Sequence, residues 1–228
     1  MGMLQNDFIG ERLRSVGEMI RDGAILCDVG TDHAKLPIAL VSQRRIKKAY
    51  ATDINKGPIA AANKNINEMS LSDKIECILT DGLESTQDLG ITDISICGMG
   101  GELIVSILSR CDYVRDSNIN LVLQPMTHTE DLRRFLYDNG FVIDDELLVK
   151  ETGKLYVIIR AHFENTAQIY TDIELMLGKI LLSKERDELF VEMAQRALYH
   201  LKNRQKSNDV SEAEYAKKLH DEIIEVLG

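Results

Sequence analysis

The sequence of 228 residues predicts an α/β protein with a mostly parallel sheet and a helical C-terminal segment. Over the first 164 residues, short apolar runs that end in polar residues alternate with stretches of helical period. Beyond them glycine and proline nearly disappear, and apolar residues recur at helical spacing. We therefore expect an α/β domain over residues 1–164 and a helical coiled-coil hairpin over residues 165–228.

Composition limits the classes of protein that this chain can form. Apolar residues make up 44% of it, as in globular domains, and no run approaches the roughly 18 apolar residues of a membrane span. Because the N-terminus also lacks a signal-peptide pattern, we expect a cytoplasmic protein that does not contact membranes. The formal net charge of -10 disfavours nucleic-acid binding over the whole surface but allows a local basic face. Four cysteines without a Cys-x-x-Cys pair predict buried thiols and no metal.

The first elements are a helix and a strand. Four apolar residues from Ile9 to Ile20 have helical spacing. An apolar run then begins at Ile25, ends at Asp28 and passes into a turn that contains Gly30. Helix-forming residues follow at once, which is the pattern of a first strand that meets a first helix.

The turn after this strand is the expected ligand site, because ligands of open α/β sheets bind at the carboxyl ends of the strands. A dinucleotide site would carry Gly-x-Gly-x-x-Gly, of which the chain has only Gly30. The carboxylate of Asp32 stands where a diphosphate would lie. It suits a ligand with positive charge, such as the sulfonium and α-ammonium groups of S-adenosylmethionine. An ordinary strand-to-helix turn is the structural alternative for this fragment.

The second and third strands also end in aspartate. Residues 49–53 form a strand that ends at Asp53, where an acidic residue can accept hydrogen bonds from both ribose hydroxyls of an adenosine. Residues 75–79 form the third strand, which Asp81 follows. Each aspartate alone is often a turn or capping residue. Their repetition at successive strand ends favours adenosine binding.

The fourth and fifth strands complete the parallel part of the expected sheet. Residues 93–97 lead into Gly98-Met99-Gly100-Gly101, and three glycines in four residues allow a closer backbone approach than a simple turn needs. Residues 120–125 form the fifth strand, after which Thr127 and Glu130 suggest a capping box. Residues 141–149 and 154–163 are then expected to pair as antiparallel strands.

Helices are expected between the strands and throughout the C-terminal segment. The helix after the first strand carries Pro37 in its first turn, where proline is tolerated. Residues 57–69 and 103–108 also have helical character. In the C-terminal segment a stripe over residues 169–201 is either one long helix or two, and a stripe over residues 215–226 returns after a turn.

Six motifs of this chain carry a resemblance to a known family. They are Asp28-Val-Gly-Thr-Asp-His-Ala-Lys-Leu-Pro37, Arg12-Leu13, Thr52-Asp-Ile54, Asp81-Gly82-Leu83, Gly98-Met-Gly-Gly101 and Leu123-Gln-Pro125. Together they resemble the bacterial tRNA (adenine-22-N1)-methyltransferases of the TrmK type, essentially over the whole chain. The resemblance implies a Rossmann-like class I methyltransferase sheet, S-adenosyl-L-methionine as cofactor, and N1 of adenine 22 in tRNA as the methyl acceptor.

Residue roles follow from the chemistry and this resemblance. We expect Asp53 to bind the ribose, Asp81 the adenine amino group, and the residues nearest Asp28 the methionine half, with Arg12 facing its carboxylate. The Asn/Asp-Pro-Pro-aromatic motif of adenine-N6 methyltransferases is missing, so the glycine-rich turn is expected to orient an adenine flipped out of the stack. The expected cofactor-binding residues are Arg12, Asp28, Gly30, Asp32, His33, Asp53, Ile54, Asp81, Gly82 and Gly98. The expected catalytic residues are Asp32, Gly98, Met99, Gly100 and Gly101.

Several alternatives stay open at this stage. An NAD-dependent oxidoreductase shares the fold class but requires the missing glycines. A methyltransferase of the same fold could act on another RNA site, a protein or a small molecule, and a noncatalytic RNA-binding protein could retain the fold. The oligomeric state is open, as is whether the helical hairpin contacts tRNA or a second subunit. His128, His162, His200 and His220 are expected to be structural or surface residues without partners that suggest a metal or catalytic dyad.

Overall fold

A seven-stranded sheet is the framework of the protein in the computed structural model, which describes residues 9–228. Its strands coincide with the apolar runs of the sequence. They are β1 (Ile25–Val29), β2 (Lys48–Asp53), β3 (Ile75–Leu79), β4 (Asp93–Met99), β5 (Asn120–Pro125), β6 (Phe141–Glu151) and β7 (Lys154–Phe163).

The strand order is β3-β2-β1-β4-β5-β7-β6. Neighbouring strands from β3 to β5 run parallel, whereas β7 lies antiparallel between β5 and β6. The chain therefore moves outward from β1 to β3 and then returns to place β4 on the other side of β1. Such a reversal opens a ligand crevice at the carboxyl ends of the two central strands. The predicted α/β sheet with an antiparallel closing pair is confirmed.

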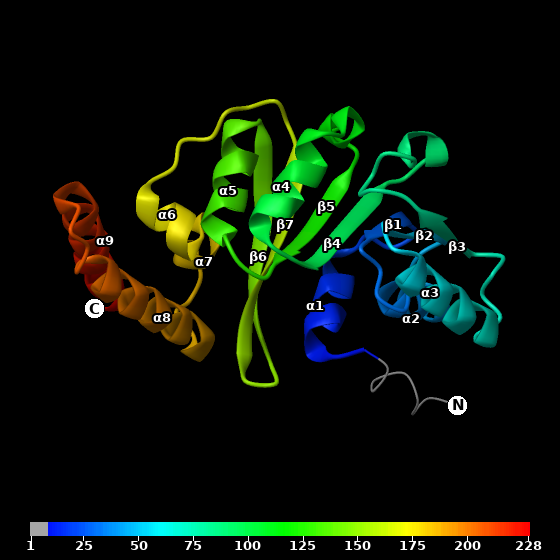
Figure 1. Cartoon of the computed structure of the whole chain (residues 1–228), viewed down its shortest axis with the longest axis horizontal. Coiled ribbons are helices and arrows are strands. Elements are labelled where there is room, and N and C mark those ends of the chain that lie inside the picture. The colour runs from blue at the N-terminus through cyan, green and yellow to red at the C-terminus, as the bar shows by residue number, and fades with distance from the viewer. Residues whose placement is uncertain (1–8) are drawn as a thin grey trace. The chain divides into compact units, whose positions relative to one another are not determined.

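Helices cover both faces of this sheet (Figure 1). The apolar core of one face joins the first three helices to the strands and includes Val16, Leu36 and Ile66. The fourth and fifth helices lie side by side on the other face. The helices of this part are α1 (Glu11–Met19), α2 (Lys35–Ser42), α3 (Lys56–Glu68), α4 (Gly101–Ser109) and α5 (Thr129–Asp138), with short 3-10 helices at Gln87–Leu89 and Asp112–Arg115.

The starts of two helices test local predictions. Pro37 is the third residue of α2, where its missing N–H is one of the groups without a partner in the helix, so this prediction is confirmed. The capping box predicted for α5 is wrong. His128 precedes α5 in a left-handed conformation (φ 55°) without a side-chain cap, and the Thr127 carbonyl accepts a hydrogen bond from the Gly101 amide at 2.7 Å. Thr127 therefore contacts the first residue of α4 and does not cap α5.

The second compact unit of the chain spans Ile169–Gly228. It contains α6 (Asp172–Leu177), α7 (Lys179–Ser183), α8 (Glu188–Arg204) and α9 (Val210–Leu227). The two long helices pack against each other, and they bury apolar faces that include Phe190, Leu201, Leu219 and Ile223. The predicted C-terminal hairpin of helices is therefore confirmed.

The stripe over residues 169–201 is interrupted twice. Gly178 separates α6 from α7 with φ 91° and ψ 124°, and Lys184 is extended after α7. The alternative of one uninterrupted helix is therefore wrong. The compact units divide after Gln168, a few residues beyond the predicted boundary between residues 164 and 165. Among residues 9–228, the structure contains no helix with the length and apolar character that crossing a membrane requires.

Candidate active site

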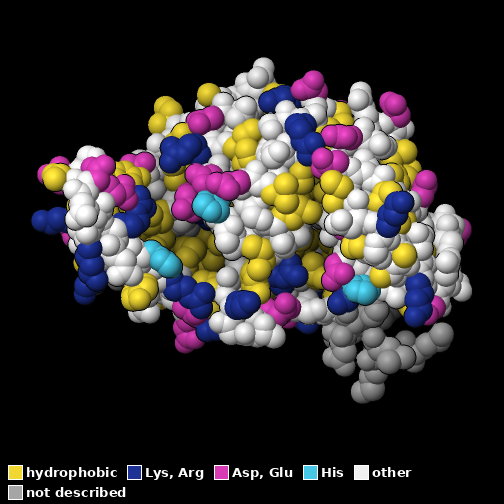
Figure 2. Space-filling view, viewed as in Figure 1, with side chains coloured by type: hydrophobic (Ala, Val, Ile, Leu, Met, Phe, Trp, Pro, Cys, Tyr) yellow, Lys and Arg dark blue, Asp and Glu magenta, His cyan; other side chains and the backbone are white. Residues whose placement is uncertain are grey.

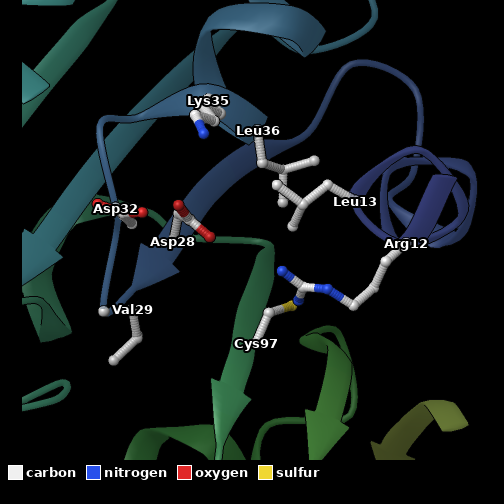
Figure 3. A pocket seen from close by; sticks show the side chains of 9 residues that line it. Arg12, Leu13, Asp28, Val29, Asp32, Lys35, Leu36 and Cys97 are labelled. Atoms are coloured by element: carbon white, nitrogen blue, oxygen red, sulfur yellow. The ribbon is translucent and has the colours of Figure 1, made fainter. Parts of the chain in front are cut away.

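The carboxyl ends of β1 and β4 border a cavity of about 120 Å³ (Figure 3). Four residues of the predicted cofactor-binding set line it together, namely Arg12, Asp28, Gly30 and Asp32. Arg12 comes from α1, and the other three belong to β1 and the turn after it. The remaining lining residues are Leu13, Val29, Lys35, Leu36 and Cys97. The cavity thus lies at the reversal point of the sheet.

Asp28 is the buried acid of this cavity. Its Oδ1 accepts a hydrogen bond from the Ser95 hydroxyl at 2.6 Å, and its Oδ2 accepts one from the Thr31 hydroxyl at 2.7 Å. Burial raises the pKa of the Asp28 carboxyl because it removes water from the charge, while the two hydroxyl donors oppose the rise. A ligand ammonium group beside Asp28 would stabilise its ionised form and be stabilised by it.

Arg12 supplies the opposite charge, and Figure 3 shows its guanidinium pointing into the cavity. Its Nη1 donates a hydrogen bond to Gln124 Oε1 at 2.6 Å. The Arg12 backbone amide donates to Glu151 Oε1 at 3.1 Å, and the guanidinium carbon lies 5.5 Å from the centre of the Tyr156 ring, within cation–π range. Strand β5 and the β6–β7 pair therefore hold this cation at the cavity.

Gly30 is where the backbone of the β1 turn meets the cavity. Its φ of +72° is one that L side chains rarely adopt, and a Cβ there would lie 2.1 Å from Met99 Cε. The side chain of Met99 therefore lies against Gly30. The backbone amide of Gly30 donates to the Thr52 carbonyl at 2.8 Å, which ties the turn to β2. The structure thus places a predicted catalytic residue, Met99, next to a predicted cofactor-binding residue.

Asp32 and His33 lie next to each other after this turn. His33 Nε2 is 3.2 Å from Asp32 Oδ1, and both side chains are exposed. The backbone of His33 is left-handed (φ 61°), and its carbonyl accepts a hydrogen bond from Asn65 Nδ2 at 3.0 Å. Asp32 belongs to the residues that line the cavity, whereas His33 does not. The contact of His33 with a cofactor stays a prediction.

The predicted adenosine-binding residues lie at neighbouring strand ends. Asp53 is opposite Leu79 in the β2–β3 register, and the Thr80 amide donates to the Asp53 carbonyl at 3.0 Å. The Asp53 side chain accepts a hydrogen bond from the Asn55 amide at 2.7 Å through Oδ1. Ile54, between them, is 61% exposed, as expected of a residue that packs against a bound base. These positions agree with the predicted roles of Asp53 and Ile54 but do not test them.

Asp81 has a partner that the sequence analysis missed. Arg110 binds both of its carboxylate oxygens, with Nη1–Oδ2 and Nη2–Oδ1 distances of 3.0 Å, and it also lies 2.8 Å from Glu84 Oε1. This pairing lowers the pKa of Asp81. A carboxylate has about four lone-pair positions, so Asp81 retains capacity for another donor. Gly82 follows, and its carbonyl lies 3.4 Å from the Thr52 hydroxyl. Arg110 therefore orients the carboxylate that we expect to meet the adenine.

The glycine-rich turn begins inside a strand. Gly98 and Met99 are the last residues of β4, and the register with β5 shifts between Cys97 and Met99. The Gly98 amide donates to Gln124 Oε1 at 3.1 Å. Gly100 follows as the residue that precedes α4, and a Cβ there would lie 3.2 Å from the Thr127 hydroxyl. The turn is thus a strand irregularity that passes directly into a helix.

Gly101 is placed for packing. A Cβ on Gly101 would lie 2.2 Å from the backbone carbonyl oxygen of His128, a separation that no side chain tolerates. Its amide is already bonded to the Thr127 carbonyl. The structure therefore explains this glycine by the close approach of two backbones. The predicted catalytic role of Gly101 gains no support from this placement. Gly98, Met99 and Gly100 are not among the residues that line the cavity, and their catalytic roles stay predictions.

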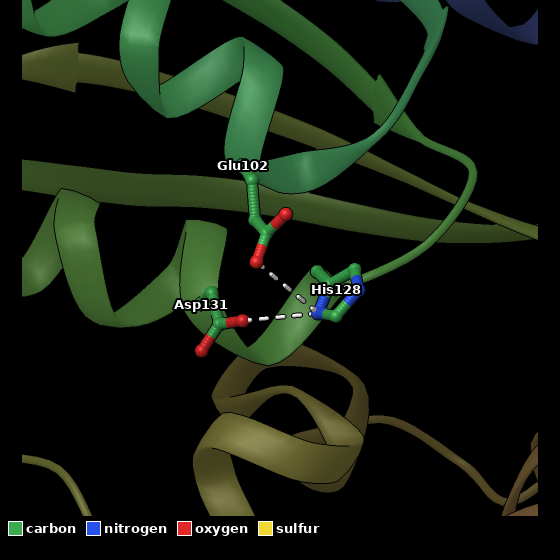
Figure 4. A group of neighbouring side chains, drawn as sticks. All are labelled: Glu102, His128 and Asp131. Carbon is green, nitrogen blue, oxygen red and sulfur yellow. Dashed lines mark hydrogen bonds and ion pairs between the residues drawn. The ribbon is translucent and has the colours of Figure 1, made fainter.

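A second polar cluster joins the starts of α4 and α5 (Figure 4). His128 Nδ1 lies 3.2 Å from Asp131 Oδ2 and 4.0 Å from Glu102 Oε1. The expectation that His128 has no partners that suggest a metal is wrong, because Glu102 and Asp131 form with it a group that could hold one. His162 contacts Asp144 and Glu164 and is partly exposed.

Three groups able to bind a metal gather in the cluster of Figure 4, with donor atoms within 4.8 Å of one another. All three side chains have substantial exposure. Both carboxylates lie in the first turn of a helix, where the helix dipole favours anions and disfavours a cation. This electrostatic setting explains the cluster without a metal, and the absence of a metal from the protein stays a prediction.

The surface around these elements carries charges of both signs. Figure 2 shows Lys and Arg side chains interspersed with Asp and Glu on the face that it presents. Two large apolar side chains near the glycine-rich turn are also exposed, with 49% exposure for Leu103 and 46% for Met126. The Met126 amide donates to the Met99 carbonyl at 2.8 Å, which attaches Met126 to the end of β4. An apolar surface therefore adjoins the turn.

The strand order and the crevice at β1 and β4 define a methyltransferase-type α/β protein, and residues 9–159 match the family model of a methyltransferase domain. The tRNA (adenine(22)-N(1))-methyltransferase of Bacillus subtilis is 32% identical over 195 residues, which cover 84% of this chain and 82% of that protein. The chain therefore belongs to the tRNA (adenine(22)-N(1))-methyltransferase family.

Solved structures agree with this relationship. A provisionally named tRNA (m1A22) methyltransferase of Streptococcus pneumoniae, in complex with S-adenosyl-L-methionine, is 34% identical and superimposes with a TM-score of 0.85 over 96% of this chain and 100% of that chain. The Bacillus subtilis m1A22 tRNA methyltransferase TrmK is 27% identical, with a TM-score of 0.85 over 96% of this chain and 99% of that chain. These matches include the C-terminal helices as well as the sheet.

Proposed function

We propose that the protein transfers a methyl group from S-adenosyl-L-methionine to N1 of adenine 22 in tRNA. The observation that carries this proposal is the pair of opposite charges, Arg12 and Asp28, in the cavity at the reversal point of the sheet. The methionine end of S-adenosyl-L-methionine carries one carboxylate and one ammonium group, which complement that pair. The acceptor is supported by the family to which the chain belongs.

Different residues of the site fit different parts of the cofactor. The cavity of about 120 Å³ is smaller than the roughly 300–1,000 Å³ of sites for whole ligands, so it suits the methionine end alone. Arg12 would bind the carboxylate of that end and Asp28 its ammonium group. Asp53 would accept from the ribose hydroxyls and Asp81 from the adenine amino group, at the neighbouring strand ends. Gly30 has no Cβ, and the Met99 side chain fills that space, so Met99 lies beside the turn that would hold the cofactor.

Methyl transfer to adenine N1 depends more on the positioning of the reacting groups than on a strong base. When bound, S-adenosyl-L-methionine supplies an electrophilic methyl group. Adenine N1 carries an in-plane lone pair, so it needs no prior deprotonation, and the positive charge formed on the ring can be relieved by loss of a proton from the exocyclic amine. Asp32, exposed at the edge of the cavity, can stabilise this developing charge. Holding the lone pair in line with the methyl group is then the main task of the protein.

The glycine-rich turn and its surroundings are suited to hold the acceptor base. Gly98 and Gly100 present backbone without side chains, and exposed Met126 and Leu103 offer apolar surface for the face of a flipped adenine. The Gly101 amide is engaged by a backbone carbonyl, so the contact with the base falls to the earlier residues of the turn. In this proposal tRNA is the macromolecular partner, and a cytoplasmic location follows from that substrate.

The experiment that tests this function combines the purified protein with methyl-labelled S-adenosyl-L-methionine and unmodified tRNA, followed by nucleoside analysis. We expect the label in 1-methyladenosine, and we expect it to vanish with a tRNA that carries guanosine in place of adenosine 22. Label in another nucleoside would contradict the proposed acceptor site. Transfer to small molecules or proteins but not to tRNA would favour the alternative acceptors, and a thermal shift with NAD but not with S-adenosyl-L-methionine would favour an oxidoreductase.

A further inference from the structure

Gln124 is a fully buried side chain whose amide bonds to three different parts of the site. It lies near the end of β5, next to β4, with 0% of its surface exposed. Its Oε1 accepts from Arg12 Nη1 at 2.6 Å and from the Gly98 amide at 3.1 Å. Its Nε2 donates to the Pro125 carbonyl at 2.8 Å. A buried amide with these partners is held in one orientation.

The bond to Gly98 compensates for the irregularity of β4. Where the register with β5 shifts between Cys97 and Met99, the Gly98 amide leaves the ladder of backbone hydrogen bonds. A backbone amide that leaves the ladder needs another acceptor, and the side-chain oxygen of buried Gln124 supplies it in a part-buried contact. The start of the glycine-rich turn is therefore positioned by a side chain from the neighbouring strand.

The bond to Arg12 connects the same oxygen atom to the cofactor end of the site. Arg12 is otherwise held by Glu151 and by the ring of Tyr156, both on the β6–β7 pair. Because Arg12 and Gly98 share one acceptor atom, a movement of the guanidinium changes the hydrogen bond that remains for the turn. Gln124 thus joins Arg12, one of the cations that line the cavity, to the backbone of the turn through a single atom.

We propose that Gln124 is a positioning residue that couples the cofactor end of the site to the acceptor turn. This inference rests on the proposed function. Arg12, drawn toward the carboxylate of a bound amino-acid end, shifts its hydrogen bond with Gln124 Oε1, and the turn at Gly98 adjusts to the altered acceptor. The base and the methyl group are then aligned only when Arg12 is engaged. Gln124 itself touches neither reacting group.

Two replacements separate this role from simple packing. Gln124→Met keeps the volume and removes both acceptor bonds. Gln124→Glu keeps the acceptor oxygens but places a second oxygen against the Pro125 carbonyl, where the amide now donates. Val122→Ala is the matched control, because Val122 is buried on the same strand two residues earlier and belongs to the apolar core. Cofactor affinity by calorimetry, melting temperature and single-turnover methylation rate at saturating cofactor are measured for each.

We expect Gln124→Met to lower the single-turnover rate about tenfold or more at saturating cofactor, as misplacement of reacting groups does. Val122→Ala should lower the melting temperature while its rate at saturating cofactor stays within about twofold of the wild type, since it changes packing alone. We expect Gln124→Glu to lose rate as well, because the fixed orientation of the amide is lost. A Gln124→Met or Gln124→Glu protein that folds and retains the wild-type rate would overturn the proposal.

The coupling is tested by combining Gln124→Met with Arg12→Met. If one oxygen links the two residues, the fold-losses in rate and in cofactor affinity will not multiply, and the double variant will resemble the more severe single variant. Losses that multiply would show independent roles and overturn the proposal. Wild-type protein that binds cofactor but fails to methylate tRNA would instead contradict the proposed function. The cofactor affinities of the two single variants and the double variant would still test the coupling.

Discussion

Asp53 is the residue at which the adenosine assignment can be tested most directly. Its side chain accepts one hydrogen bond from the Asn55 amide, so removal of the carboxylate alters the loop as well as the ligand contact. Asp53→Asn retains an acceptor for Asn55 but loses the charge. We expect both Asp53→Ala and Asp53→Asn to weaken cofactor binding, because each charge-assisted bond to a ribose hydroxyl contributes about 1.5–3 kcal/mol.

Isothermal calorimetry with S-adenosyl-L-methionine checks this prediction, and an affinity loss of about 10- to 100-fold corresponds to the energies above. Asp88→Ala is the control, since Asp88 is exposed on a neighbouring connection and belongs to neither strand end. Unchanged affinity in both Asp53 variants would remove the ribose assignment. A loss in Asp53→Ala alone would assign the effect to the loop.

Gly100 and Gly101 separate catalytic from packing effects at adjacent positions. The backbone of Gly100 (φ -65°, ψ 146°) is one that any residue adopts, and an added Cβ would meet only the rotatable Thr127 hydroxyl, at 3.2 Å. Gly100→Val should therefore fold and bind cofactor while it blocks the approach of the adenine. Gly101→Ala should instead lower the melting temperature, because its Cβ would overlap the His128 carbonyl. Single-turnover rates at saturating cofactor and thermal melts distinguish the two outcomes.

His33→Ala completes this comparison. On the positioning mechanism it should cost less turnover than Gly100→Val, because transfer to adenine N1 needs no general base. A chemical step that His33→Ala abolishes and Gly100→Val leaves nearly unchanged would require a proton-transfer mechanism. It would also refute the assignment of the turn as the acceptor pocket.

At the scale of elements, the β6–β7 pair carries a titratable contact. His162 Nδ1 lies 2.8 Å from Asp144 Oδ2, and its Nε2 lies 3.0 Å from Glu164 Oε1. Partial burial disfavours the charged imidazole, but the two carboxylates outweigh it and raise the pKa of His162. This contact therefore stabilises the protein fully below the ordinary histidine pKa of about 6.5, and the contribution is lost as the pH rises through the higher folded value.

The prediction is that His162→Gln lowers the melting temperature more at about pH 5.5 than at about pH 8.5. The effect should be modest, because the groups are partly exposed and screened by solvent. Thermal melts of both proteins at the two pH values measure it. An equal or larger loss at the higher pH would contradict the assigned direction of the pKa shift.

The elements themselves were predictable where burial leaves a simple pattern. Strands β1, β2, β4 and β5 are largely buried and appear in the sequence as short apolar runs, and β3 and β5 have the predicted bounds. The aspartates at the strand ends were also predictable, because each stands at or just after the end of such an apolar run. Partners from distant elements were not, because nothing near Arg110 in the sequence points to Asp81 and a Gln-Pro dipeptide does not reveal a bond to Gly98. Each of these bonds joins two residues that are distant in the sequence and meet only in the folded chain.

At the scale of the whole molecule, we expect the C-terminal hairpin to help hold a large folded RNA. Three cations lie near its turn, at Lys202, Arg204 and Lys206. Arg204 is engaged within the hairpin, because it pairs with Glu212 at 2.6 Å and lies over the ring of Tyr215. We therefore assign phosphate contacts to Lys202 and Lys206, whose side chains are exposed at the end of α8 and in the turn after it.

The corresponding prediction is that Lys202→Glu combined with Lys206→Glu weakens tRNA binding and leaves the affinity for S-adenosyl-L-methionine unchanged. Each lost phosphate contact should reduce the slope of log binding constant against log salt by about one unit. Lys217→Glu combined with Lys218→Glu, on α9, is the control for a general change in net charge. Filter binding at several salt concentrations measures the slopes. If the hairpin serves instead as a subunit contact, the first pair of substitutions will change the sedimentation of the protein and leave the salt slope of tRNA binding as it is in the wild type.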